Sequence, residues 1–129
     1  MTLSMILSIA AFAETVTGLL ALVCPSVLIR LLFGGETGGT GVIVCRFTGI
    51  ALVGLSIACW PGKKSGQTSY GMLTYSTLAM LYLAFLGISG TGGVLLWPAV
   101  VAHALLSALI LRALLLQTKR ELSKGADSV

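Results

Sequence analysis

Five residues of this chain carry reactive side chains within or beside long apolar stretches: Glu14, Arg46, Tyr75, Tyr82 and His103. A carboxylate, an imidazole and phenols at membrane depth can bind and release protons or hold a polar ligand. An ionised carboxylate is costly there unless it is paired or protonated. We therefore predict a midplane polar site that binds or transports a proton, an ion or a small amphipathic ligand, and these five are its candidate residues.

The spacing along the chain places three of these side chains at one depth. Glu14 lies about 11 residues into the first apolar stretch, which corresponds to roughly 16 Å of helix. Tyr82 and His103 lie roughly 18 Å and 15 Å from the starts of their own stretches. Arg46 lies only about 6 Å deep, and its long side chain can reach down to the site or back to the membrane surface.

Helical periodicity indicates which faces carry these groups. Residues that share a face recur every three or four positions, and small residues on a face let membrane helices approach each other. Glu14 falls on a small, weakly polar stripe, so we expect it to face the protein interior or a subunit interface. The predicted stripes are Ala10, Glu14, Thr17, Ala21 and Cys24 on the first helix, Tyr75, Ala79, Tyr82 and Leu86 on the third, and Ala99, His103 and Ser107 on the fourth.

Four apolar stretches must position these residues. Each approaches the roughly 20 residues that a helix needs to cross about 30 Å of hydrocarbon. Pro25 is expected to kink or break the long first stretch near its far end. The predicted fold is an all-α, four-transmembrane-helix bundle in one domain, 1–129, with helices at about 3–33, 42–60, 69–88 and 94–117 and a polar tail at 118–129.

Composition supports a membrane protein and excludes several other classes. Hydrophobic residues make up 57% of the chain and charged residues 9%, whereas soluble domains average about 25% charged. Transmembrane β-strands alternate apolar and polar residues, and these continuous apolar stretches do not. The net charge of +4 comes from a few basic residues near helix ends, so we expect lipid contacts and no nucleic-acid partner.

The basic residues also predict an orientation. Lys63, Lys64, Lys119, Arg120 and Lys124 fall in the second connection and the tail, and basic segments are normally cytoplasmic. We therefore expect both ends of the chain in the cytoplasm of a bacterium and a multi-pass protein in its inner membrane. Arg30 and Arg46, beside the first connection, weaken this charge asymmetry.

Two stretches resemble a known type of protein. The first is Leu22–Gly34, which includes Cys24-Pro25, together with Arg46–Leu55. The second is Leu95–Ala104, which includes Trp97-Pro98 and His103. Together they resemble small four-helix bacterial inner-membrane proteins of unassigned function, a resemblance that implies a fold and no activity. Separately, Glu14 after small residues in the first helix resembles the coupling carboxylate of small multidrug-resistance transporters, which implies proton-coupled efflux.

Other functions remain open on the sequence alone. The chain could be a non-catalytic accessory subunit of a larger membrane complex, or an intramembrane enzyme with His103 and Tyr82 as acid–base groups on a lipid or quinone-like substrate. Four short helices enclose little volume, so we expect a homo-oligomer or a membrane partner. No ligand spacing links Cys24, Cys45 and Cys59, so we predict no metal and no cofactor.

Overall fold

The computed structural model describes residues 2–36, 38–60 and 65–126, and within these ranges it contains helices and no strands. Four of the helices are long and apolar enough to cross a membrane, which confirms the predicted number of spans and indicates a membrane protein. The helices are α1 (Leu3–Val23), α2 (Pro25–Phe33), α3 (Gly39–Ala58), α4 (Ser65–Ile88) and α5 (Leu96–Ala126).

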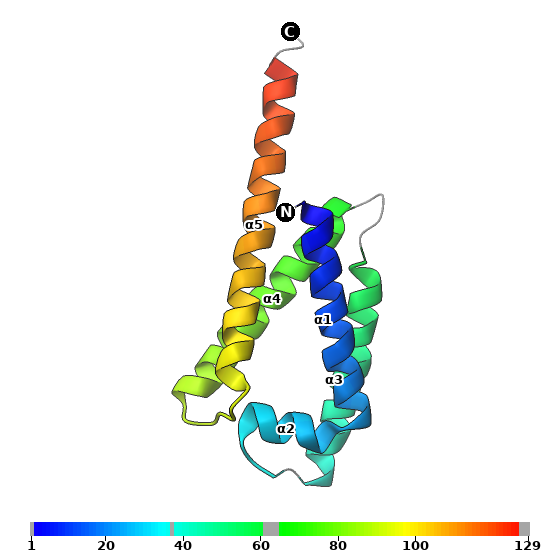
Figure 1. Ribbon diagram of the computed structural model, residues 1–129, viewed down its shortest axis with the longest axis vertical. Helices are drawn as coiled ribbons and strands as arrows, with labels where there is room; N and C mark the ends of the chain where they lie inside the picture. The colour runs from blue at the N-terminus through cyan, green and yellow to red at the C-terminus, as the bar shows by residue number, and fades with distance from the viewer. Residues whose placement is uncertain (1, 37, 61–64, 127–129) are drawn as a thin grey trace.

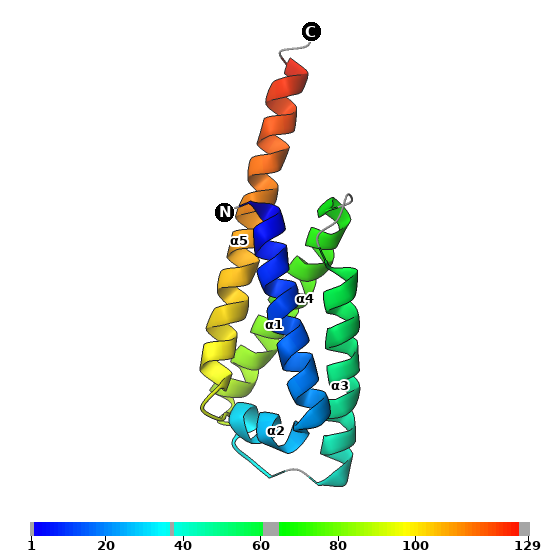
Figure 2. The same cartoon turned by 45° about the vertical axis from the view of Figure 1, so that its right-hand side comes forward.

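The first predicted helix is two helices, divided where Pro25 was expected to break it. The hydroxyl of Thr2 accepts a hydrogen bond from the amide of Met5 at 3.4 Å and caps the start of α1. Cys24 leaves the helical conformation, with φ −127° and ψ 58°, and Pro25 then begins α2. Proline suits a first helical position because its missing amide would have no partner there. Figures 1 and 2 show α2 turned across the end of the bundle.

The four long helices alternate in direction. The start of α1, the end of α3 and the start of α4 lie near one end of the bundle, and α5 runs toward and past that end (Figures 1 and 2). The other end carries α2 and the connection between α4 and α5. The two ends of the described chain therefore lie on the same side, as four spans require. Lys63 and Lys64 of the predicted topology signal lie outside the described residues.

Two glycines set the contact between α1 and α3. A Cβ atom on Gly18 would lie 2.9 Å from the carbonyl oxygen of Gly49, and one on Gly49 would lie 2.6 Å from that of Gly18. No larger side chain fits at either position without moving a helix backbone. Without a strong hydrophobic drive between helices in lipid, such close packing is a main source of association.

The antiparallel pair of α4 and α5 forms with the short connection that the sequence predicts at residues 89–93. Gly90 turns the chain with φ of +80°, a conformation that favours glycine. A Cβ atom on Gly87 would meet the side chains of Leu96 and Trp97 at 2.8 Å and 3.1 Å. Farther from the connection, the hydroxyl of Thr77 on α4 donates a hydrogen bond to the hydroxyl of Ser107 on α5 at 3.3 Å.

The last helix is longer than predicted. The apolar stretch ends near Gln117, and the sequence suggested a polar tail from residue 118, whereas α5 continues to Ala126. Lys, Arg, Glu and Leu are good helix formers, so the end of the hydrophobic pattern does not end the helix. Figure 1 shows this segment projecting beyond the rest of the bundle. The polar residues from 118 to 126 are thus helical.

The best-packed part of the molecule lies beside the first half of α1. Its buried members are Leu3, Ile6, Leu7, Ala10, Cys59, Met72 and Ile110. Large apolar side chains elsewhere face outward, among them Phe12, Phe47, Phe85 and Leu105. So much exposed apolar surface suits contact with lipid rather than water.

Candidate functional site

Side chains from three helices meet around one carboxylate. The hydroxyl of Tyr75 donates a hydrogen bond to Oε2 of Glu14 at 3.0 Å. The Nδ1 atom of His103 lies 4.0 Å from Oε1 of the same carboxylate. The Tyr75 and His103 rings contact each other edge to face, with centroids 5.8 Å apart and planes at 82°. We call these three residues the carboxylate cluster.

Glu14 reaches the interior because of its position on α1. The buried residues of α1 recur every three or four positions and include Ala10, Glu14, Gly18 and Ala21. Glu14 itself is 5% exposed. Two other members of the predicted stripe diverge from it, since Thr17 is half-buried and Cys24 is exposed. The small neighbours leave room for a carboxylate between the helices.

The carboxylate cluster lies near the middle of α1 and α4 and nearer to the start of α5. Glu14 is about 11 residues, or roughly 16 Å, from the start of α1, and Tyr75 is roughly 15 Å from the start of α4. His103 is roughly 10 Å along α5, which runs in the opposite direction. The side chain of His103 keeps 17% of its surface exposed, whereas that of Glu14 keeps 6%.

The carboxylate cluster places one acid, the carboxyl of Glu14, next to one base, the imidazole of His103. Among the described residues, no Lys or Arg contacts Glu14, and its polar neighbours are the phenol of Tyr75 and the imidazole of His103. A buried carboxylate without a full positive partner is costly, so a proton held on Glu14 or on His103 lowers the cost. The arrangement therefore suits proton exchange or the binding of a cation in place of the proton.

The carboxylate cluster lies beside tightly packed apolar side chains. Tyr75 and Leu106 pack against the buried apolar group that contains Leu7, Ala10 and Met72. Next to Tyr75 in sequence, the hydroxyl of Ser76 is buried and has no hydrogen-bond partner among the described residues. Sequence reasoning did not single out Ser76. Ser76 stands beside Tyr75 and Thr77, so nothing in the sequence sets it apart from its polar neighbours.

Two predicted site residues lie outside the cluster. Tyr82 is 63% exposed, although it shares a face of α4 with Tyr75 by helical spacing. Because α4 runs obliquely to α1 (Figures 1 and 2), its later turns leave the interior. Arg46 is exposed on α3. That helix packs beside α1 through Gly49 and presents Arg46 outward.

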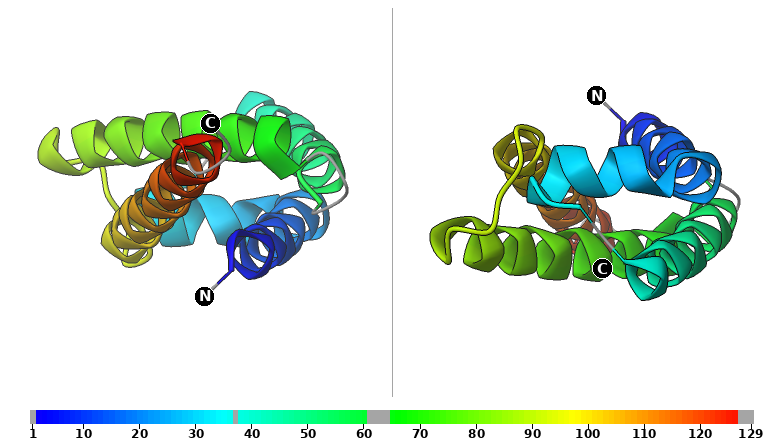
Figure 3. Two further views of the ribbon diagram at one scale, coloured as in Figure 1. Left: turned by 90° about the horizontal axis from the view of Figure 1, so that it is seen from above. Right: turned by 90° about the horizontal axis from the view of Figure 1, so that it is seen from below.

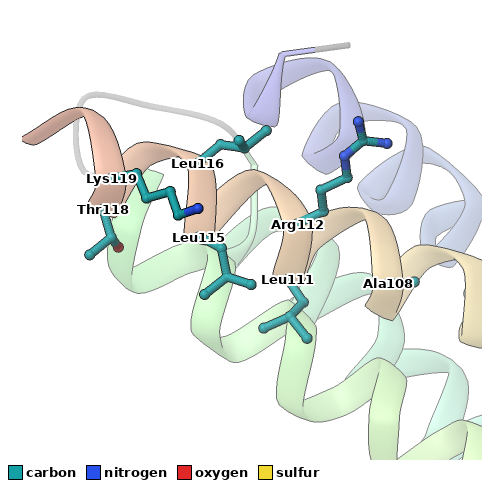
Figure 4. A pocket seen from close by; sticks show the side chains of 7 residues that line it. All are labelled: Ala108, Leu111, Arg112, Leu115, Leu116, Thr118 and Lys119. Atoms are coloured by element: carbon teal, nitrogen blue, oxygen red, sulfur yellow. The ribbon is translucent and has the colours of Figure 1, made fainter.

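The cysteines and a surface depression on α5 also lie outside the carboxylate cluster. Cys24, Cys45 and Cys59 are free thiols, and the described residues contain no group of three His, Cys, Asp or Glu side chains able to hold a metal ion. A depression of about 500 Å³ lies on α5 and is lined by Ala108, Leu111, Arg112, Leu115, Leu116, Thr118 and Lys119 (Figure 4). All of these side chains come from one helix, so the depression is an open part of the surface.

Comparisons with protein-family models, curated proteins and solved structures found no match to this chain. The functional argument therefore rests on the carboxylate cluster and its place in the fold.

Proposed function

We propose that this chain binds or transports a small cationic amphipathic ligand, or an inorganic cation, in exchange for a proton held by the carboxylate cluster. The observation that carries the proposal is the Glu14 carboxylate, buried at membrane depth with one phenol donor at 3.0 Å and one imidazole at 4.0 Å. A carboxylate is expensive at this depth, and intramembrane ionisable groups commonly mark ion pathways or ligand sites.

Each member of the cluster has a role in such an exchange. Glu14 supplies the one negative charge that a cation can neutralise. Tyr75 donates to that carboxylate and favours its ionised form when a cation is present. His103 accepts or supplies the proton, since its imidazole lies 4.0 Å from the carboxylate. The aromatic faces of Tyr75 and His103 also suit an organic cation.

The proposal includes an inner-membrane location, an orientation and an assembly. Lys119 and Arg120 lie on the projecting end of α5, on the same side as the start of α1 (Figure 1). The positive-inside rule then puts both ends of the chain in the bacterial cytoplasm. The bundle is small and its outer faces are broadly apolar, so we propose that it works as a homo-oligomer.

An intramembrane enzyme receives less support. That alternative paired His103 with Tyr82 as acid and base. Tyr82 is exposed and lies outside the carboxylate cluster, so only Tyr75 supplies a phenol beside the imidazole. A phenol bonded to a carboxylate is suited to holding that carboxylate in place.

Competition between a proton and a cation tests the proposal. Tetraphenylphosphonium is the probe, and its binding to the detergent-purified protein is measured by equilibrium dialysis at several pH values. We expect affinity to fall as pH falls, because the proton competes for Glu14, and to be lost in Glu14→Gln. Glu36→Gln, which alters an exposed carboxylate in the first connection, should behave as wild type. An affinity for tetraphenylphosphonium that does not change with pH and survives Glu14→Gln would overturn the proposal.

A further inference from the structure

Helix α2 is fixed against the connection between α4 and α5 by its last turn. The amide of Gly93 donates to the carbonyl of Leu32 at 2.7 Å, and the amide of Leu95 donates to that of Leu31 at 2.8 Å. Gly93 lies so close to the Leu31 carbonyl that a Cβ atom would overlap it. These contacts join two segments that are distant in sequence into one surface.

This junction contains a depression of about 540 Å³ that is separate from the carboxylate cluster. Its lining combines a guanidinium, three glycines and three apolar side chains: Val27, Arg30, Leu31, Gly34, Gly92, Gly93 and Val94. We call it the α2 depression. It lies between one helix and a connecting segment, so its walls come from two parts of the chain.

The α2 depression is lined by one cationic side chain and by no acidic one. Arg30 is exposed and pairs with no carboxylate among the described residues. The backbone amides of Gly92 and Val94 donate to no backbone carbonyl in the described part of the chain. A guanidinium attracts an anion, and arginine matches the oxygens of a phosphate group especially well.

The position of the α2 depression favours a lipid headgroup over free phosphate as the source of that anion. Helix α2 lies across the end of the bundle, between the end of α1 and the start of α5 (Figure 3, right). Trp97, 53% exposed, lies one residue into α5 at the same end, and tryptophan concentrates at the level of lipid headgroups. Val27, Leu31 and Val94 add an apolar rim that free phosphate cannot use.

From these observations we propose that the α2 depression binds the headgroup phosphate of an anionic phospholipid. Arg30 would pair with the phosphate, and Val27, Leu31 and Val94 would contact the glycerol and the first acyl carbons. A zwitterionic lipid presents the same phosphate beside its own ammonium group, so the site should prefer a lipid of net negative charge. The proposal is independent of the exchange at Glu14.

Spin-labelled lipids test this preference in reconstituted protein. The protein is placed in phosphatidylcholine vesicles with a trace of spin-labelled phosphatidylglycerol or phosphatidylcholine, and the motionally restricted fraction gives their relative association. We expect wild type to prefer phosphatidylglycerol by about fivefold, the ratio that one basic contact at a membrane surface provides. Arg30→Gln should bring the ratio close to one.

Arg46→Gln is the matched control, since it removes the same charge from an exposed site on α3. It should leave the preference unchanged. Equal preference in wild type and Arg30→Gln would overturn the proposal, as would an equal loss in Arg46→Gln, which would indicate a general charge effect. Loss of the preference in inorganic phosphate, but not in chloride of equal ionic strength, would assign the site to free phosphate instead.

Discussion

The phenol oxygen of Tyr75 lies 3.0 Å from Oε2 of Glu14 and joins α4 to α1 at membrane depth. Among the described residues no other side chain donates a hydrogen bond to Glu14, and Nδ1 of His103 lies 4.0 Å from its second carboxylate oxygen. The bond therefore joins two helices and gives the buried carboxylate a hydrogen-bond donor.

Removing the Tyr75 hydroxyl should destabilise the bundle. Tyr75→Phe leaves the ring in place and deprives the buried Glu14 carboxylate of its donor, which typically costs about 1–3 kcal/mol. Thermal unfolding in detergent, followed by loss of the monodisperse peak on size exclusion, should show a lower midpoint. Tyr82→Phe alters an exposed phenol on the same helix and should leave the midpoint unchanged. Equal midpoints for Tyr75→Phe and wild type would refute this role.

Glu14 and His103 should be coupled in energy. Their side chains approach to 4.0 Å, and neighbouring polar residues commonly show coupling of about 0.5–3 kcal/mol. The stability loss of the double variant Glu14→Gln, His103→Gln should be smaller than the sum of the two single losses, because each single change leaves the other group with a poorer partner. Strict additivity would show that the two groups act separately.

The glycine contact between α1 and α3 should tolerate no added carbon. Gly49→Ala puts a Cβ atom 2.6 Å from the carbonyl oxygen of Gly18, so α1 and α3 must move apart. We expect a lower unfolding midpoint and weaker probe binding, because α1 carries Glu14. Gly54→Ala is the control on the same helix, since a Cβ atom there meets nothing within 4 Å and alanine favours helix by about 1 kcal/mol. Similar midpoints for both variants would contradict this account of the packing.

The orientation of the chain in the membrane can be determined by fusing reporter proteins to its last residue. Alkaline phosphatase folds to an active enzyme only outside the cytoplasm, whereas green fluorescent protein fluoresces inside it. With Lys119 and Arg120 on the cytoplasmic side, a C-terminal fluorescent fusion should be bright and a phosphatase fusion inactive. An active phosphatase fusion would reverse the proposed topology.

Much of the architecture follows from the sequence because the bilayer imposes a simple length rule. Four long apolar stretches predict four spans, and Pro25 predicts the division between α1 and α2. The end of α5 could not be placed, since a polar segment in solvent can be helical or not. A hydrophobic pattern indicates which residues contact lipid. It does not indicate whether the polar residues that follow the apolar stretch are helical.

The site shows where sequence reasoning stops. The small residues around Glu14 predict an inward carboxylate, and the structure brings it to Tyr75 and His103. Tyr75 and Tyr82 share one face by spacing, so periodicity alone could not choose between them. The oblique path of α4 decides the matter, and helix tilt depends on packing rather than on the pattern of one helix.

The most direct test of the central claim is the number of protons released when a cation binds. Tetraphenylphosphonium is added to the protein in weakly buffered detergent solution at a pH where Glu14 holds its proton, and the pH change is followed with an indicator dye. We expect about one proton to be released per cation bound, because the two compete for one carboxylate, and we expect the same result for Glu36→Gln. Binding without proton release by wild type, or equal release by Glu14→Gln, would contradict it.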